Sequence, residues 1–202
     1  MASYAAGFLL LLSSLCALAQ PEAGRDYLPI IQVQQPQGDK IELVEFFYYG
    51  CPQCFELEPI LQDWLERRRD IKIVRIPAFR SSWLALAKAY YALEIMGQED
   101  RLRRRIFSAL HDGMDLIDER VLFDWIGKQG IDRKKFESVY FSSDVANKID
   151  DSEKKARRLG ISGVPSLVVD GRYLVLGNLA RTDILDQLVA MAEKERISQP
   201  LQ

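Results

Sequence analysis

Two cysteines, Cys51 and Cys54, are the residues whose type and spacing most directly suggest chemistry. They enclose Pro52 and Gln53, after an apolar segment and before one with helical periodicity. Two thiols so spaced at the start of a helix can form a small disulfide, and Pro52 suits the first helical position. Unpaired N–H groups and the positive end of the helix dipole favour the thiolate of the first sulfur. We therefore predict a redox-active disulfide, with Cys51 the exposed nucleophile and Cys54 the buried resolving thiol.

The same cysteines allow two other interpretations, half of a zinc site and an inert structural bridge. Zinc takes four ligands. Beyond the pair, the chain offers only Cys16 near its N-terminus and a single histidine, His111. We therefore expect no metal, and no cofactor other than the Cys51–Cys54 disulfide itself. For His111, which lies in no motif, we expect an interaction at the end of a helix.

A second chemical element is Gly163-Val164-Pro165-Ser166, which directly precedes a strand-like segment. A proline at the head of a strand lacks the N–H that would pair in a ladder. In the cis form, Pro165 would leave Val164 presenting free N–H and C=O groups to an extended peptide. Because a Cys-x-x-Cys pair lies upstream, we predict the cis form and include Pro165 and Val164 in the site.

Glu45 stands out because it interrupts an apolar strand six residues before Cys51. A buried unpaired carboxylate is costly, so Glu45 either lies at an edge open to water or has a partner. Strand alternation makes Arg75 the nearest candidate. The aromatic residues around the cysteines are expected in the core, with one or two lining an apolar groove: Phe46, Phe47, Tyr48, Tyr49 and Phe55.

The elements that must position these residues are strands at both ends of the chain with helices between. Strands are predicted at 30–33, 41–47 and 71–76, the second apolar enough to be central. A helix follows the cysteines, with Pro59 inside it and one apolar face formed by Leu57, Ile60, Leu61, Trp64 and Leu65. The first part is therefore a β-α-β unit with parallel strands.

The middle of the chain carries helical signals only. Helices are predicted from Ser81 or Ser82 to Gly97, then over 100–110, 118–128, 132–140 and 143–159. A hairpin follows, with strands 166–169 and 173–176 joined by Asp170-Gly171, and a last helix spans 182–196. This order is the thioredoxin plan, an α/β fold, with a helical insertion. We expect a thioredoxin-like domain at 20–80 and 160–202 and the helical insertion at 81–159.

The first nineteen residues contain no Lys, Arg, Asp or Glu. Their apolar run is shorter than the roughly 20 residues that span a bilayer, and it ends in Ala17-Leu18-Ala19, a signal-peptidase pattern. We predict a signal peptide cleaved after Ala19, which removes Cys16 and places the protein in an oxidising export compartment. The alternative is an uncleaved N-terminal anchor.

Composition narrows the function classes. The chain has 202 residues, of which 48% are hydrophobic and 28% charged, and this composition excludes an intrinsically disordered protein. Its net charge of −2 provides no positive field to attract nucleic acid. Two arginine runs, 67–69 and 103–105, lie among acids on helices, and we expect them on solvated faces. No G-x-S-x-G or H-E-x-x-H motif supports a hydrolase.

The segment 45–54, the helical insertion and the segment 163–173 together resemble the DsbA family of periplasmic thiol–disulfide oxidoreductases over essentially the whole mature chain. The resemblance implies a donor of disulfides to newly exported proteins, reoxidised by a membrane partner of the DsbB type. It also implies that Glu45 is a buried acid that relays protons to or from Cys54. A valine before the cis-proline, here Val164, is similar to the residue found in the oxidase branch of the family.

One position departs from this family, whose typical dipeptide between the cysteines is Pro-His. Gln53 offers an amide N–H donor but no charge, and charge-assisted hydrogen bonds are roughly twice as strong as neutral ones. We therefore predict a milder oxidant.

Two alternatives to a disulfide donor stay open. One is an exported thioredoxin-like reductase or isomerase, and the other is a non-enzymatic chaperone or metal-binding module with a thioredoxin fold. An isomerase usually needs a dimerisation domain, for which little chain remains, so we expect a monomer.

Overall fold

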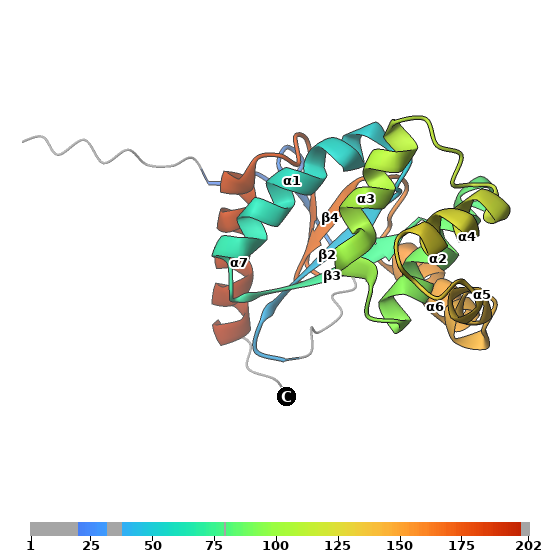
Figure 1. Ribbon diagram of the computed structural model, residues 1–202. Coiled ribbons are helices and arrows are strands. Elements are labelled where there is room, and N and C mark those ends of the chain that lie inside the picture. The colour runs from blue at the N-terminus through green and yellow to red at the C-terminus, as the bar shows by residue number, and fades with distance from the viewer. Residues whose placement is uncertain (1–19, 32–37, 79, 199–202) are drawn as a thin grey trace, which may run out of the picture.

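A computed structural model describes residues 20–31, 38–78 and 80–198 of the chain (Figure 1). Its centre is a mixed sheet of five strands in the order β1-β5-β4-β2-β3. The strands are β1 Tyr27–Pro29, β2 Ile41–Phe47, β3 Ile71–Pro77, β4 Ser166–Val169 and β5 Tyr173–Val175. Only β2 and β3 pair in parallel; β4 pairs antiparallel with β2 and β5, and β5 with β1.

Strand β2 is an interior strand covered on both faces, as predicted, although β4 is the middle strand of the five. Strand β2 is buried along nearly its whole length, between β3 and β4. Helix α1 (Pro52–Arg67) connects it to β3, which confirms the β-α-β unit. The parallel register places Glu45 of β2 opposite Arg75 of β3. A buried strand thus ends immediately before the two cysteines and fixes their position.

The first predicted strand was wrong by three residues, because β1 lies at Tyr27–Pro29 rather than 30–33. The Tyr27 ring packs edge-on against the Tyr173 ring at 5.1 Å between centroids, and Tyr27 is paired with Val175. This packing selects the register, and Ile31 is left 98% exposed. Residues 32 and 33 lie outside the described residues, as do Cys16, the predicted signal peptide and its cleavage site.

One face of the sheet is covered by α1 and α7 (Thr182–Ser198). Their contact residues form one apolar cluster with the sheet, including Leu57, Leu61 and Trp64 from α1 and Leu185 and Leu188 from α7. Ile60, predicted on the same helix face, is instead 37% exposed.

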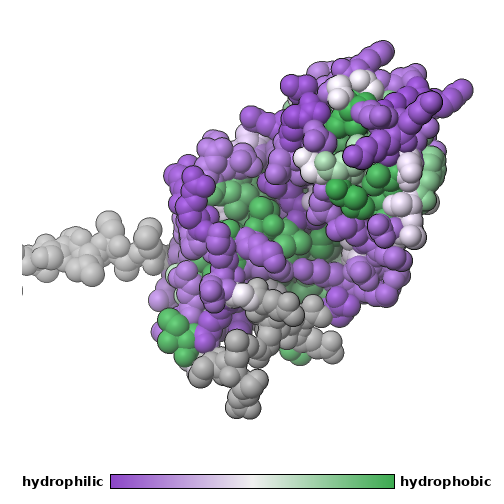
Figure 2. Space-filling model, turned by 60° about the horizontal axis from the view of Figure 1, so that its bottom comes forward, coloured by the Kyte–Doolittle hydropathy of each residue, from purple (hydrophilic) through white to green (hydrophobic). Residues whose placement is uncertain are grey.

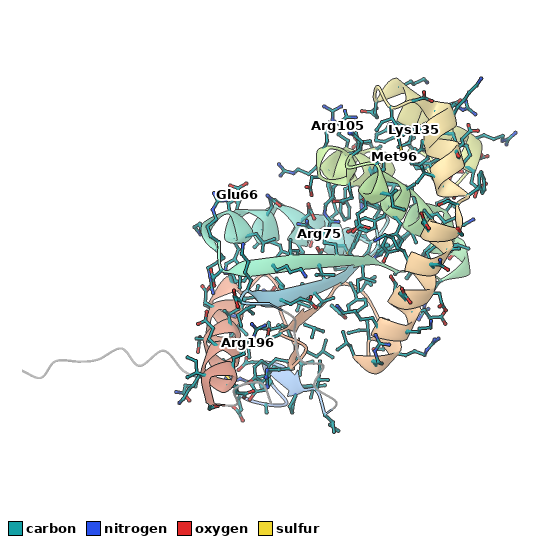
Figure 3. The ribbon with its side chains drawn as sticks, turned by 90° about the horizontal axis from the view of Figure 1, so that it is seen from below. Glu66, Arg75, Met96, Arg105, Lys135 and Arg196 are labelled. Carbon is teal, nitrogen blue, oxygen red and sulfur yellow. The ribbon has the colours of Figure 1, made fainter. Side chains whose placement is uncertain are left out.

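The other face is covered by the end of α6 (Ser143–Arg158), as the view from below shows (Figure 3). Partly buried apolar residues such as Ile30, Val74 and Leu174 lie on this face. In Figure 2, apolar atoms are visible in the middle of the molecule between hydrophilic borders.

The helical segment lies beside the sheet (Figure 1) and follows the predicted helices within a few residues. A 3-10 turn at Ser81–Trp83 leads into α2 Leu84–Ile95, α3 Glu99–His111, α4 Glu119–Lys128, α5 Arg133–Tyr140 and α6. Asp118 and Asp132 cap α4 and α5 by accepting backbone hydrogen bonds. The Asp170-Gly171 turn has positive φ at both residues, which confirms the hairpin.

The helical segment contacts the cysteine turn through its apolar core. The apolar cluster of the helical segment contains Phe47, Tyr49 and Cys54, so the end of β2 and the start of α1 are part of its core. Among the described residues, no helix has the length and apolar character needed to cross a membrane.

Candidate active site

The two cysteines lie at the start of α1, where β2 turns into the helix. Cys51 is the N-cap residue and Pro52 occupies the first turn. The Cys51 N–H donates to the Tyr48 carbonyl at 3.0 Å, and the Phe55 N–H donates to the Cys51 carbonyl at 3.0 Å. Both cysteines are free thiols, Cys51 half-buried and Cys54 completely buried. The predicted difference in exposure is confirmed.

The Cys51 thiol faces two oxygen atoms. Its Sγ lies 3.4 Å from Gln53 Oε1 and 3.8 Å from the Val164 carbonyl oxygen, both of which accept from the S–H group. In this thiol form the S–H group is the donor and the Gln53 amide oxygen an acceptor. The amide N–H donor expected from the sequence concerns the Cys51 thiolate and stays a prediction. The arrangement joins Cys51 to a loop 113 residues away in sequence.

That loop has the predicted geometry, because the Val164–Pro165 peptide bond is cis. Its Val164 carbonyl points at the Cys51 sulfur. Pro165 leads directly into β4, which pairs with β2, the strand that ends before the cysteines. The sheet therefore holds the loop and the cysteine turn against each other.

Cys54 has no comparable access to solvent. Burial raises the pKa of its thiol far above the ordinary value, and the neighbouring Cys51 and the negative charge of Glu45 act in the same direction. A backbone hydrogen bond from Tyr48 opposes this but is weaker. Cys54 is therefore a protonated thiol at neutral pH.

Glu45 is completely buried, so the edge position considered from the sequence is wrong. Its Oε2 accepts from Arg75 Nε at 3.1 Å, which confirms the partner expected from strand alternation. Arg103 adds a second partner, with its Nη2 3.3 Å from Oε1 and 3.1 Å from Oε2 of Glu45. The buried carboxylate is thus paired with two guanidinium groups.

Arg103 corrects another expectation, because it is 2% exposed rather than on a solvated face. Its Nε donates to Glu58 Oε2 at 2.7 Å, and its Nη1 lies 3.5 Å from Glu99 Oε1. Glu58, expected outside the apolar face of α1, is also buried. Helical spacing indicates the burial of both residues. Arg103 falls on the apolar stripe of Leu102, Ile106 and Phe107, and Glu58 lies beside Leu57 and Leu61.

Glu99 is the third carboxyl group of this cluster. Burial raises its pKa to about 7, against the attraction of Arg103 and Arg75. The Tyr49 hydroxyl donates to Glu99 Oε1 at 3.4 Å. In Figure 3, Arg75 lies between α1 and α3.

An apolar groove of about 680 Å³ begins at Cys51. The Tyr48 ring stacks on the Trp83 ring along it, with centroids 4.4 Å apart. Of the five aromatic residues considered from the sequence, Phe46 and Tyr48 line the groove, and Phe47 and Tyr49 belong to the core. Phe55 is in neither place, because it is 36% exposed on α1. The other lining residues are Gly50, Cys51, Pro52, Ala78, Arg80, Trp83, Ala156, Ile161, Ser162, Gly163 and Val164.

The expectation that His111 interacts at the end of its own helix is wrong. Its Nε2 donates to the Tyr49 carbonyl at 3.2 Å, and its ring stacks on Phe55 with centroids 4.4 Å apart. The histidine thus connects the turn before Cys51 to the first turn of α1, a long-range contact that no local pattern indicates.

Comparison with known proteins gives one family. A family model described as "DSBA-like thioredoxin domain" matches residues 75–189, a range that begins after the two cysteines. The "Thiol:disulfide interchange protein DsbA" of Burkholderia cepacia is 35% identical over 161 residues, 77% of this chain and 76% of that protein. The protein of the same name from Pseudomonas aeruginosa PAO1 is 34% identical over 157 residues, 75% of this chain and 74% of its own length.

Solved structures agree. The oxidoreductase DsbA from Xylella fastidiosa has a TM-score of 0.81 at 28% identity, covering 87% of this chain and all of that one. Pseudomonas aeruginosa DsbA has a TM-score of 0.79 at 30% identity, covering 88% of this chain and 96% of that one. The thioredoxin fold with its helical insertion is confirmed.

Proposed function

Because the chain belongs to the DsbA-like thioredoxin family, we propose that it introduces disulfide bonds into reduced exported proteins by exchange through Cys51 and Cys54. The observation that carries this proposal is the contrast between the two sulfur atoms. Cys51 lies at the start of a helix, beside an apolar groove and the Val164 carbonyl. Cys54 is buried one turn further on.

The reaction takes place in two exchanges. A substrate thiolate attacks the Cys51 sulfur of the Cys51–Cys54 disulfide, forming a mixed disulfide, and Cys54 leaves with the bonding electron pair. The raised pKa of Cys54 means that this thiolate readily takes a proton. A second substrate thiolate then attacks the substrate sulfur of the mixed disulfide, and Cys51 leaves as a thiolate. Two electrons pass from the substrate to the protein.

Cys51 is the better leaving group of the pair because of its surroundings. The helix N-terminus, with Pro52 in the first turn, directs unpaired backbone N–H groups toward developing negative charge. Gln53 carries no charge and contributes less than a histidine would. The protein is therefore a milder oxidant than one with a Pro-His dipeptide on the same scaffold.

Substrates bind as extended, unfolded segments. The Val164 carbonyl and Pro165 supply backbone recognition beside the reacting sulfur, and the groove along Phe46, Tyr48 and Trp83 accepts apolar side chains. A groove with few polar groups discriminates weakly between sequences. That suits a catalyst that must act on many different proteins.

Glu45 serves Cys54 as a buried acid, taking or giving the proton that accompanies each exchange. In the division expected from the sequence, residues 20–80 and 160–202 carry the reacting groups. The insertion at 81–159 contributes Trp83 to the groove and Arg103 to Glu45.

The protein acts in the periplasm as a monomer, after cleavage behind Ala19. A membrane oxidase of the DsbB type restores its disulfide. No cofactor is required, because the reacting disulfide is part of the chain.

Trapping in cells tests these assignments. Without Cys54, the mixed disulfide at Cys51 persists, so the full-length Cys54→Ala protein, produced in an exporting bacterium, should accumulate covalent complexes with exported cysteine-containing proteins. The Cys51→Ala/Cys54→Ala variant is the matched control. The mature N-terminus should be Gln20. Complexes with cytosolic proteins only, or none beyond the control, would reject the proposed substrates and compartment.

A further inference from the structure

The least expected residue near the dithiol is Arg103, a buried arginine supplied by the helical segment. We propose that Arg103 is a positioning residue for the redox reaction: it holds the Glu45 carboxylate near Cys54, in place to take and return the Cys54 proton, and so couples the docking of α3 to the chemistry of the dithiol. The inference rests on the proposed function in one respect, that Cys51 and Cys54 are the reacting pair.

The contacts of Arg103 support this role. Each nitrogen of its guanidinium faces a carboxylate from a different residue: Nε faces Glu58 on α1 at 2.7 Å, Nη2 faces Glu45 on β2 at 3.1 Å, and Nη1 faces Glu99 on α3 at 3.5 Å. The guanidinium carbon lies 4.2 Å from the centre of the Phe47 ring. A planar fork of donors can satisfy this arrangement, whereas the single ammonium of a lysine cannot.

The charges of the cluster do not balance without Arg103. Three buried carboxylates face two guanidinium groups, and in the described residues Arg75 forms its salt bridge only with Glu45. Among the described residues, removal of Arg103 would leave Glu58 and Glu99 without a salt-bridge partner and Glu45 with Arg75 alone. An uncompensated buried anion is costly, and proton uptake relieves that cost. The cluster would then take up a proton, and the carboxylate that receives the Cys54 proton would no longer be held in place.

The charge of Glu45 matters because it acts on Cys54, whose pKa it helps to raise. When Cys54 resolves a mixed disulfide, its S–H proton leaves, a bond forms between the two cysteine sulfurs, and the substrate sulfur departs with the electron pair. A Glu45 carboxylate held in place can take that proton, so the rate of this step depends on the contacts that Arg103 makes. Among the described residues, Arg75 on β3 and Arg103 on α3 form salt bridges with Glu45, and Cys54 on α1 feels its charge. Glu58 on α1, Glu99 on α3 and Tyr49 after β2 surround Arg103.

The test is the pH profile of disulfide formation when the reduced protein reacts with oxidised glutathione, between about pH 5 and about pH 9. The Cys54→Ala variant reports the attack by Cys51 alone, so the Cys54 step can be separated. In Arg103→Met, the Cys54 step should slow by about tenfold at the acid end of this range, where the cluster takes up its proton. In a Glu45→Gln background, which lacks the proton acceptor, Arg103→Met should have little further effect. Arg103→Lys keeps the charge but not the fork of donors and should restore the wild-type profile only in part.

The matched control is Arg104→Met, which replaces the exposed neighbouring arginine on α3 and should leave the profile unchanged. Should Arg103→Met fail to fold, the comparison is made in a Glu58→Gln background, where the orphaned Glu58 charge is absent. A variant that loses stability but keeps the wild-type profile for the Cys54 step would show that Arg103 is merely structural. A wild-type protein that does not react with glutathione would instead reject the proposed function.

Discussion

The two cysteines carry the same functional group in very different surroundings. Cys51 is half-exposed and its thiol faces two oxygen acceptors, Gln53 Oε1 and the Val164 carbonyl. Cys54 is enclosed by apolar residues, and its pKa is raised by burial and by Glu45. At the scale of single residues, this asymmetry decides which sulfur meets a substrate and which one closes the disulfide.

Alkylation measures the asymmetry directly. Because Cys54 is buried and protonated, iodoacetamide should modify the folded, reduced protein at Cys51 only, even at mildly alkaline pH, and both cysteines only after unfolding. Mass spectrometry of the labelled peptides gives the answer, with Cys51→Ala as the control that stays unlabelled while folded. Comparable labelling of Cys54 in the folded protein would contradict the proposed roles.

Gln53 sets the strength of the oxidant. Gln53→His places a group that can be positively charged beside the Cys51 sulfur, and this charge stabilises the Cys51 thiolate. The concentration of reduced glutathione needed to reduce half of the variant's disulfide should therefore be about tenfold lower than for the wild type. Gln53→Glu, nearly isosteric, should shift the equilibrium the other way. Titration with glutathione buffers measures both shifts, and Gln62→His, further along α1, is the control. Equal equilibria for the three proteins would mean that residue 53 does not determine the redox potential.

At the scale of elements, α3 has a double function. One side of this helix packs in the core of the helical segment through Leu102, Ile106 and Phe107. The same stripe presents Arg103 and Glu99 to α1 and β2. The helix thus contributes both apolar packing and buried charge to the floor of the site.

The buried Glu99 should make stability depend on pH. Its pKa is raised from 4.5 to about 7, so the folded protein retains a proton that the unfolded chain releases. Stability should therefore be highest below about pH 4.5 with respect to this group and fall as the pH rises toward 7, by at most about 3 kcal/mol.

Glu99→Gln removes that titration. In urea unfolding, the variant should be more stable than wild type near pH 8 and show a weaker loss of stability between about pH 5 and about pH 8. Asp100→Asn, at the exposed neighbouring position, serves as the control. If the Glu99→Gln variant loses as much stability between pH 5 and pH 8 as the wild type does, then Glu99 stays ionised in its pair with Arg103.

Most elements could be predicted from the sequence because their signals are local. Alternating or continuous apolar residues indicated β2, β3 and the hairpin, and capping aspartates marked α4 and α5. The first strand could not be located in this way, because its register depends on the packing of Tyr27 against Tyr173. The cysteine pair and the cis Val164–Pro165 bond were predicted because each lies in a short motif.

The ion cluster beneath the site could only partly be predicted. Glu45 and Arg75 are paired by strand register, a regular relation that the sequence allows one to infer. Glu58 and Arg103 meet only because α1 and α3 approach each other, a tertiary contact between distant parts of the chain. The same holds for His111 and the Tyr49 carbonyl. Runs of three arginines are normally solvated, and for that reason the sequence wrongly indicated an exposed position for Arg103.

For the whole molecule, the reacting sulfurs lie where three parts meet. The end of β2 and the start of α1 bring the cysteines, the hairpin brings the Val164–Pro165 loop, and the helical segment encloses Cys54 within its own apolar core. The groove that begins at Cys51 is lined by all three parts. Neither the sheet nor the helices alone would form the site.

The most direct test of this account is stoichiometric disulfide transfer to a reduced, unfolded protein. The oxidised full chain should lose its Cys51–Cys54 disulfide as the substrate gains one, with a mixed disulfide through Cys51 as the intermediate. Cys51→Ala should transfer nothing, and Cys54→Ala, first converted to its mixed disulfide with glutathione, should pass only that single disulfide to the substrate. Thiol counting and mass spectrometry follow both partners. A substrate that stays reduced with the wild-type protein, or is oxidised equally well by Cys51→Ala, would contradict the central claim.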